Sequence, residues 1–110
     1  MDNVAGIYMI KSLSLQNKVY IGGSINIKAR WITHRTTMKR GIANARLQKH
    51  FDKYGLSDLS FTVLLICNKN ELPIKEQEYI DKYKPYFNYS NVNRTQRRKS
   101  KMEFQYSDNL

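Results

Sequence analysis

The chain has 110 residues, of which 41% are hydrophobic and 12% aromatic. This length suits one domain with a modest core, and the apolar content argues against a wholly disordered chain. Nineteen Lys and Arg residues stand against nine Asp and Glu residues, which gives a net charge of +10. Such an excess favours a polyanionic partner, most often nucleic acid. A basic surface without a partner is the alternative that charge alone leaves open.

The positive charge is concentrated in the first half of the chain. No acidic residue lies between Asp2 and Asp52. The same stretch holds nine cations: Lys11, Lys18, Lys28, Arg30, Arg35, Lys39, Arg40, Arg46 and Lys49. Their mutual repulsion has no local compensation, and phosphates lying against this half of the molecule would relieve it.

Several classes of protein are excluded by simple counts. The single cysteine, Cys67, cannot form an intramolecular disulfide, and its apolar neighbours predict a small buried thiol. The thiol and the two histidines, His34 and His50, show no zinc-ligand spacing. No segment approaches the roughly 18 apolar residues of a membrane span, and the first ten residues do not resemble a signal peptide. We therefore expect an intracellular, cytoplasmic protein without a membrane partner.

Two short apolar segments, residues 6–10 and 18–22, predict an antiparallel hairpin with a loop longer than a tight turn. A register with Tyr8 opposite Tyr20 also places Gly6 opposite Gly22. Directly opposed residues have Cβ atoms about 4.5–5.5 Å apart, so both phenols would reach one small ligand. The alternative is an aromatic pair that only packs.

Two helices are predicted next. The first carries residues at helical spacing: Ile27, Trp31, His34 and Met38. Ser24 or Asn26 is its expected cap, and it should end near Gly41. The second carries Leu47, Phe51 and Tyr54, and Gly55 should end it.

The rest of the chain completes an α+β domain. Residues 61–66 form a short continuous apolar run and predict a buried strand. A third helix should begin near Pro73 and end before Lys84 and Pro85. The order β-β-α-α-β-α contains no repeat or linker, so residues 1–92 are expected to form one folded domain. Residues 93–110 have no periodicity and carry five cations, which predicts a flexible basic tail.

Three charged or titratable residues fall close to the predicted core. Glu76 shares its helical stripe with Leu72 and Tyr79 or Ile80, and an unpaired buried carboxylate is costly. It therefore needs a salt bridge, a raised pKa or a hard cation such as Mg²⁺. Arg30 and His34 lie four residues apart, where they could bind a phosphate and transfer a proton, or simply form a solvated helix face.

The motifs together resemble the GIY-YIG nuclease superfamily. They are GIY at 6–8, YIG at 20–22, RWITH at 30–34, EQEYI at 76–80 and FN at 87–88. The resemblance covers about residues 4–92. Residues 22–24 and 47–55 look like the homing-endonuclease and phage branch of that family.

This resemblance implies a small three-stranded antiparallel sheet flanked by helices, which hydrolyses DNA phosphodiester bonds with one divalent metal, Mg²⁺ or Mn²⁺. By motif match, Glu76 would hold the metal and Arg30 would steady the scissile phosphate. Tyr8 and Tyr20 would help to position and deprotonate the attacking water. His34 would support that network, and Asn88 would order the site. Some relatives have a further histidine after the first helix. In this sequence either Asn44 occupies the space of that histidine or the site works without such a group. His50 is expected to be structural or solvated.

Double-stranded DNA is the expected partner. Its phosphates should be contacted by nine cations: Lys18, Lys28, Arg35, Lys39, Arg40, Arg46, Lys49, Arg97 and Arg98. Such contacts are blind to sequence, so we expect low intrinsic specificity unless a homodimer or a separate DNA-targeting module supplies it. A catalytically silent DNA-binding module on the same scaffold is the alternative function. A structural nucleoprotein component would explain the charge but not the ordered motifs.

Overall fold

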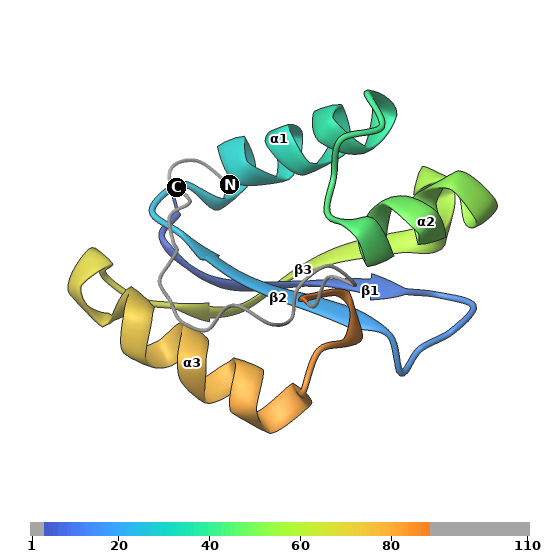
Figure 1. Ribbon diagram of the computed structural model, residues 1–110. Coiled ribbons are helices and arrows are strands. Elements are labelled where there is room, and N and C mark those ends of the chain that lie inside the picture. The colour runs from blue at the N-terminus through green and yellow to red at the C-terminus, as the bar shows by residue number, and fades with distance from the viewer. Residues whose placement is uncertain (1–3, 89–110) are drawn as a thin grey trace.

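The computed structural model describes residues 4–88, which fold into a three-stranded antiparallel sheet between two layers of helices (Figure 1). The strands and α-helices are β1 (Gly6–Ser12), β2 (Val19–Ser24), α1 (Ile27–Lys39), α2 (Ala45–Tyr54), β3 (Leu59–Ile66) and α3 (Leu72–Tyr83). Three short 3₁₀ turns join them: η1 (Leu56–Asp58), η2 (Lys69–Glu71) and η3 (Tyr86–Asn88). The predicted α+β class and element order are confirmed. The predicted basic tail, 93–110, lies outside the described residues.

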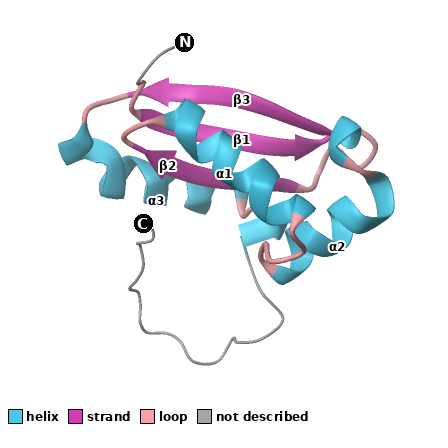
Figure 2. Ribbon diagram, turned by 90° about the horizontal axis from the view of Figure 1, so that it is seen from above, coloured by secondary structure: helices cyan, strands magenta, loops and turns pink. Residues whose placement is uncertain are grey.

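The sheet has the order β2-β1-β3, so β1 is central (Figure 2). Helices α1 and α2 cover one face and α3 covers the other (Figure 1). The prediction of a buried strand at residues 61–66 is wrong in one respect, because β3 is an edge strand and Ile66 is 71% exposed. Cys67 follows this strand and is only partly buried, so the prediction of a buried thiol is also wrong.

The hairpin register differs from the predicted one by two residues. Tyr8 pairs with Gly22, and Tyr20 pairs with Ile10. Because a shift of two keeps every side chain on its face, the two phenols still share one face, but diagonally. The physical reason lies outside the hairpin: the carboxylate of Asp58 accepts hydrogen bonds from Ser12 Oγ at the end of β1, at 2.8 Å, and from Ser14 in the loop that follows.

The helix ends follow ordinary capping rules. Asn26 Oδ1 accepts a hydrogen bond from Ala29 N at 3.1 Å, as expected for the cap of α1. Asn44 caps α2 in the same way, and Gly55, with φ of 83°, ends that helix. Lys84 takes a left-handed conformation at the end of α3.

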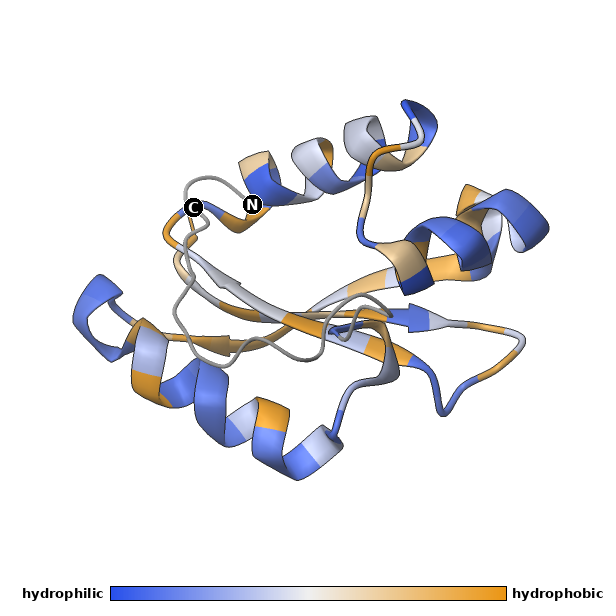
Figure 3. Ribbon diagram, in the orientation of Figure 1, coloured by the Kyte–Doolittle hydropathy of each residue, from blue (hydrophilic) through white to orange (hydrophobic). Residues whose placement is uncertain are grey.

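Hydrophobic residues are frequent along the strands, as the orange segments in Figure 3 show, and they form two buried clusters. The cluster under α1 and α2 consists of Tyr8, Ile10, Ile27, Met38, Leu47, Leu59 and Phe87. The cluster under α3 consists of Ile7, Met9, Val19 and Ile21. Within residues 4–88, no helix has the length and apolar character needed to cross a bilayer. The cluster under α1 and α2 contains Tyr8, which is also part of the candidate site.

Candidate active site

Three aromatic rings from three elements meet under α1. Tyr8 from β1 and Tyr20 from β2 have ring centroids 6.2 Å apart. The ring of His34 from α1 lies edge-on to both, at 5.7 Å and 5.0 Å. The hydroxyl of Tyr8 and Nε2 of His34 are joined by a buried hydrogen bond of 2.7 Å. The structure thus brings together three residues predicted from the sequence.

Both partners of this hydrogen bond are uncharged near neutral pH. Burial raises the pKa of Tyr8 well above its ordinary value; the nearby Tyr20 adds to this rise, and Arg30 opposes it. Burial, followed by the charge of Arg30, lowers the pKa of His34 to about 3. A neutral imidazole with its proton on Nδ1 leaves Nε2 able to accept the phenol proton.

The space for the Tyr8 phenol comes from a missing side chain. Gly22 lies opposite Tyr8 in the sheet, and a Cβ there would come within 2.5 Å of the Tyr8 hydroxyl oxygen. Such a separation is far below van der Waals contact, so any larger residue would displace the ring. The glycine of the YIG motif is therefore required by the position of the first tyrosine.

A second glycine makes room on the opposite face. Successive strand residues point to opposite faces, and a Cβ on Gly23 would lie 3.2 Å from both Glu76 Oε1 and Ile7 Cδ1. The carboxylate of Glu76 thus reaches β2 from α3 while the phenols approach from the other face. The candidate site wraps around the β2 edge of the sheet.

Arg30 links the two sides electrostatically. Burial raises the pKa of Glu76 to about 7, and the charge of Arg30 opposes that rise. The same guanidinium contributes charge and a side-chain hydrogen bond at Tyr8, where the charge of Glu76 is also felt. The charge of Arg30 therefore acts on both a partly buried carboxylate and a buried phenol, and a guanidinium that does so is suited to bind a phosphate.

Asn88 acts on the backbone of β2. Its Oδ1 accepts from Ile21 N at 2.7 Å, and its Nδ2 donates to Ile21 O at 2.7 Å. This pair of bonds satisfies the outward-facing backbone groups of an edge strand, as a further strand would. Asn88 thereby fixes the segment between Tyr20 and Gly22 without joining the ring cluster.

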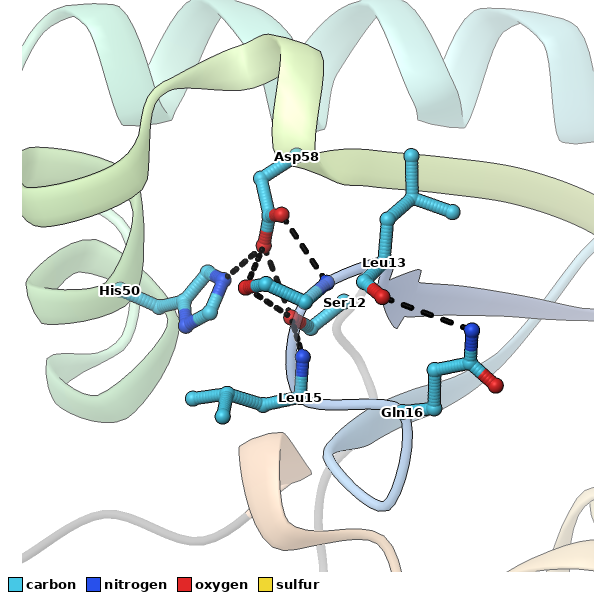
Figure 4. A network of polar contacts seen from close by, with 7 residues as sticks. Ser12, Leu13, Leu15, Gln16, His50 and Asp58 are labelled. Carbon is cyan, nitrogen blue, oxygen red and sulfur yellow. Dashed lines mark hydrogen bonds and ion pairs between the residues drawn. The ribbon is translucent and has the colours of Figure 1, made fainter.

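Two other polar residues are engaged elsewhere. Asn44 caps α2 and donates from Nδ2 to Phe87 O at 2.9 Å, so both ends of its side chain are engaged in holding α2 and η3. His50 is buried, and its Nε2 lies 2.8 Å from Asp58 Oδ2 in the network that holds the β1–β2 loop (Figure 4). Its place in this network is structural.

The predicted DNA-contacting cations are spread over several elements. Lys28, Lys39 and Arg40 lie exposed on α1 or at its end, and Lys49 is exposed on α2. Arg35 packs over the ring of Phe61, with 5.1 Å from its Cζ to the centroid. Lys18 and Arg46 both contact Tyr86. Arg97 and Arg98 lie outside the described residues.

Sequence reasoning gave no structural role to Gly23 or Tyr86. The doubled glycine at 22–23 was the available signal for the first, because two adjacent glycines in a strand remove one side chain from each face. Nothing in the local sequence singled out Tyr86, whose cationic neighbours come from distant segments.

Comparisons with known proteins agree on one likeness. The family described as GIY-YIG catalytic domain matches residues 4–91. Intron-associated endonuclease 1 of Enterobacteria phage T4 is 32% identical in an alignment of 80 residues that covers 66% of this chain. This chain therefore spans about a third, 32%, of that relative's length.

Two solved structures are similar in both fold and sequence. The catalytic domain of intron endonuclease I-TevI superposes with a TM-score of 0.66, over 82% of this chain and 99% of that one. A mutant of the same domain gives 0.69, over 82% of this chain and 94% of that one. Both are 27% identical to this sequence.

Proposed function

This chain belongs to the GIY-YIG catalytic domain family, and from that premise we propose that it is a metal-dependent endonuclease acting on double-stranded DNA. It is a nuclease domain homologous to the catalytic domain of a homing endonuclease. The observation that supports cleavage most directly is the meeting of Tyr8, His34 and Glu76 around one guanidinium at the β2 edge. A module that only bound DNA would have no need of a buried phenol–imidazole pair.

The donor set fits a hard divalent cation held by few protein ligands. Among residues 4–88, no group of three or more His, Cys, Asp or Glu side chains could hold a metal ion. Mg²⁺ and Mn²⁺ sites on phosphate substrates need only one or two carboxylates, and Glu76 supplies one. Its raised pKa shows that its ionised form is poorly stabilised by the protein, so a bound cation would relieve that cost. When bound, the ion would neutralise charge on phosphate oxygens and make a nearby water more acidic.

The other residues then have distinct roles. Arg30 would hold a non-bridging oxygen of the scissile phosphate, where negative charge grows in the transition state. Tyr8 and Tyr20 would orient the attacking water, and Asn88 would keep β2 in place through Ile21. These roles use each residue where the fold positions it.

The proton of the water has a short route inward. Because burial raises the pKa of Tyr8, a free phenolate is an unsuitable base. Instead, Tyr8 would receive a proton from the water while passing its own to Nε2 of His34, 2.7 Å away. The negative charge of an arriving phosphodiester favours protonation of His34, which offsets its low resting pKa.

Low intrinsic specificity is part of the proposal. Contacts from lysine and arginine to phosphates carry no sequence information. Target choice would therefore depend on a further DNA-targeting module or on a second copy of the chain. Random duplex DNA should therefore compete with any preferred site almost equally at moderate salt.

The proposal is tested by incubating the purified chain with supercoiled plasmid in Mg²⁺, in Mn²⁺ or in EDTA. We expect nicked or linear DNA only in the presence of metal. Cleavage that persists in EDTA would contradict the metal role. DNA binding without cleavage in either metal would instead support the silent binding module.

A further inference from the structure

Two cations share one exposed aromatic ring at the end of β2. Lys18 Nζ lies 4.4 Å from the centroid of the Tyr86 ring, and Arg46 Cζ lies 4.3 Å from the same centroid. Arg46 Nη1 also donates a hydrogen bond of 3.1 Å to the main-chain carbonyl oxygen of Tyr86, which ties the backbone of η3 to α2. Three segments far apart in the sequence therefore converge: the start of β2, the first turn of α2 and η3.

This convergence concentrates positive charge. An exposed cation on an aromatic ring gains only about 0.5–1 kcal/mol, and two like charges on one ring repel each other. Within residues 4–88, no carboxylate forms an ion pair with Lys18. Lys18 thus keeps its charge available, which suits an anionic ligand.

The cluster lies beside the candidate active site. Asn88, two residues after Tyr86, is hydrogen-bonded to the backbone of Ile21. Lys18 directly precedes β2, whose residues Tyr20 and Gly22 belong to the site. Four residue-to-residue steps along the strand lead from Lys18 to Gly22, which is ~13 Å at about 3.3 Å per step. One DNA strand following the β2 edge would meet both places.

We propose that Lys18, Arg46 and Tyr86 form a docking site for a backbone phosphate of the DNA substrate, a few nucleotides from the scissile phosphate. The two cations supply the charge, and both lie over the same ring. This inference rests on the proposed function, since it assumes that the same strand is cut at the β2 edge. It assigns Tyr86 a part in binding that the motifs do not give it.

The test is the salt dependence of duplex DNA binding, measured in EDTA so that cleavage plays no part. For Lys18→Gln we expect the slope of log K against log salt to become less steep by about 0.9, the value for one lost phosphate contact. The matched control is Lys82→Gln on α3, because Lys82 Nζ also sits over a tyrosine ring, that of Tyr83, at 5.4 Å. The control should leave the slope unchanged.

A second pair of variants tests the ring itself. Tyr86 and Tyr83 are 38% and 39% exposed, so their replacement by leucine removes comparable surface rings. Tyr86→Leu should weaken binding several-fold at low salt, whereas Tyr83→Leu should not. Thermal unfolding of each variant controls for loss of structure.

The outcomes separate this inference from the proposed function. An unchanged slope in Lys18→Gln, in a protein that cuts plasmid with metal, would overturn the phosphate site alone. A reduced slope in a protein that never cuts would support the phosphate site and overturn the proposed nuclease activity. Equal effects in the Lys18 and Lys82 variants would also overturn the phosphate site, because they would indicate only a general effect of charge.

Discussion

The hydroxyl oxygen of Tyr8 lies 2.7 Å from Nε2 of His34, and the two residues are only 1% and 6% exposed. Burial acts on them in opposite directions, because it raises the pKa of the phenol and lowers that of the imidazole. Both shifts favour the neutral forms. The pair is thus a preformed proton route rather than an ion pair.

The first prediction concerns a variant that lacks this proton route. Tyr8→Phe should lower the cleavage rate by about 10²–10⁴-fold, the usual contribution of a proton-transfer group, while DNA affinity changes little. Tyr79→Phe on α3 is the control, because it removes a phenol hydroxyl outside the ring cluster. Single-turnover cleavage rates and binding isotherms provide the measurements. A Tyr8→Phe enzyme that cuts at the wild-type rate would contradict the relay.

The second prediction compares the two adjacent glycines of β2. Gly22→Ala should abolish most cleavage and cost about 1–3 kcal/mol of folding free energy, because its Cβ would lie 2.5 Å from the Tyr8 hydroxyl. Gly23→Ala should have a smaller effect, since its nearest contacts are at 3.2 Å. Chemical denaturation and plasmid cleavage would measure both. The reverse order would show that Tyr8 is not confined by this strand.

The third prediction concerns Asp58. Burial alone would raise its pKa, but hydrogen bonds from Ser12, His50 and Ser14 outweigh that effect and lower it. An acid with a lowered folded pKa contributes stability above its ordinary pKa, and this contribution is lost as pH falls through the folded value. Asp58→Asn should therefore lower the unfolding midpoint at neutral pH, with a difference that shrinks in acid. Denaturation curves across pH would measure it, and a constant difference would contradict the prediction.

The fourth prediction concerns the stability cost of Glu76 in the absence of metal. The pKa of Glu76 in the folded protein is about 7, above the ordinary 4.5. The folded state therefore becomes less stable as pH rises from 4.5 to about 7. In EDTA, Glu76→Gln should be more stable than wild type above pH 7, by roughly 1–3 kcal/mol. The gain should vanish near pH 4. Equal stability at all pH values would show that the carboxylate is not strained by burial.

Sequence patterns predicted the elements because each depends on neighbouring residues. Asn26 and Gly55 mark helix ends through their own backbone and side-chain chemistry, and the structure confirms both. The family likeness was also readable, since the motifs keep their order, and the match over residues 4–91 confirms it.

Features that depend on distant contacts were not predictable. The hairpin register is fixed partly by Asp58, which lies 46 residues beyond Ser12, so the local alternation of residues left it open. The same carboxylate explains why His50 is buried. Lys18 and Arg46 contact Tyr86 only because α2 and η3 pack near the start of β2. A local sequence pattern cannot predict such contacts between distant segments.

The most direct measurement compares plasmid cleavage in Mg²⁺ by wild type, Glu76→Gln and Glu78→Gln. Both variants neutralise one carboxylate of α3, but Glu78 is exposed and pairs with Lys75 at 3.5 Å. If Glu76 holds the metal, Glu76→Gln should bind duplex DNA with wild-type affinity and cut it at least about 10²-fold more slowly, whereas Glu78→Gln should cut normally. Undiminished cleavage by Glu76→Gln would contradict the placement of the metal and of the active site at the β2 edge.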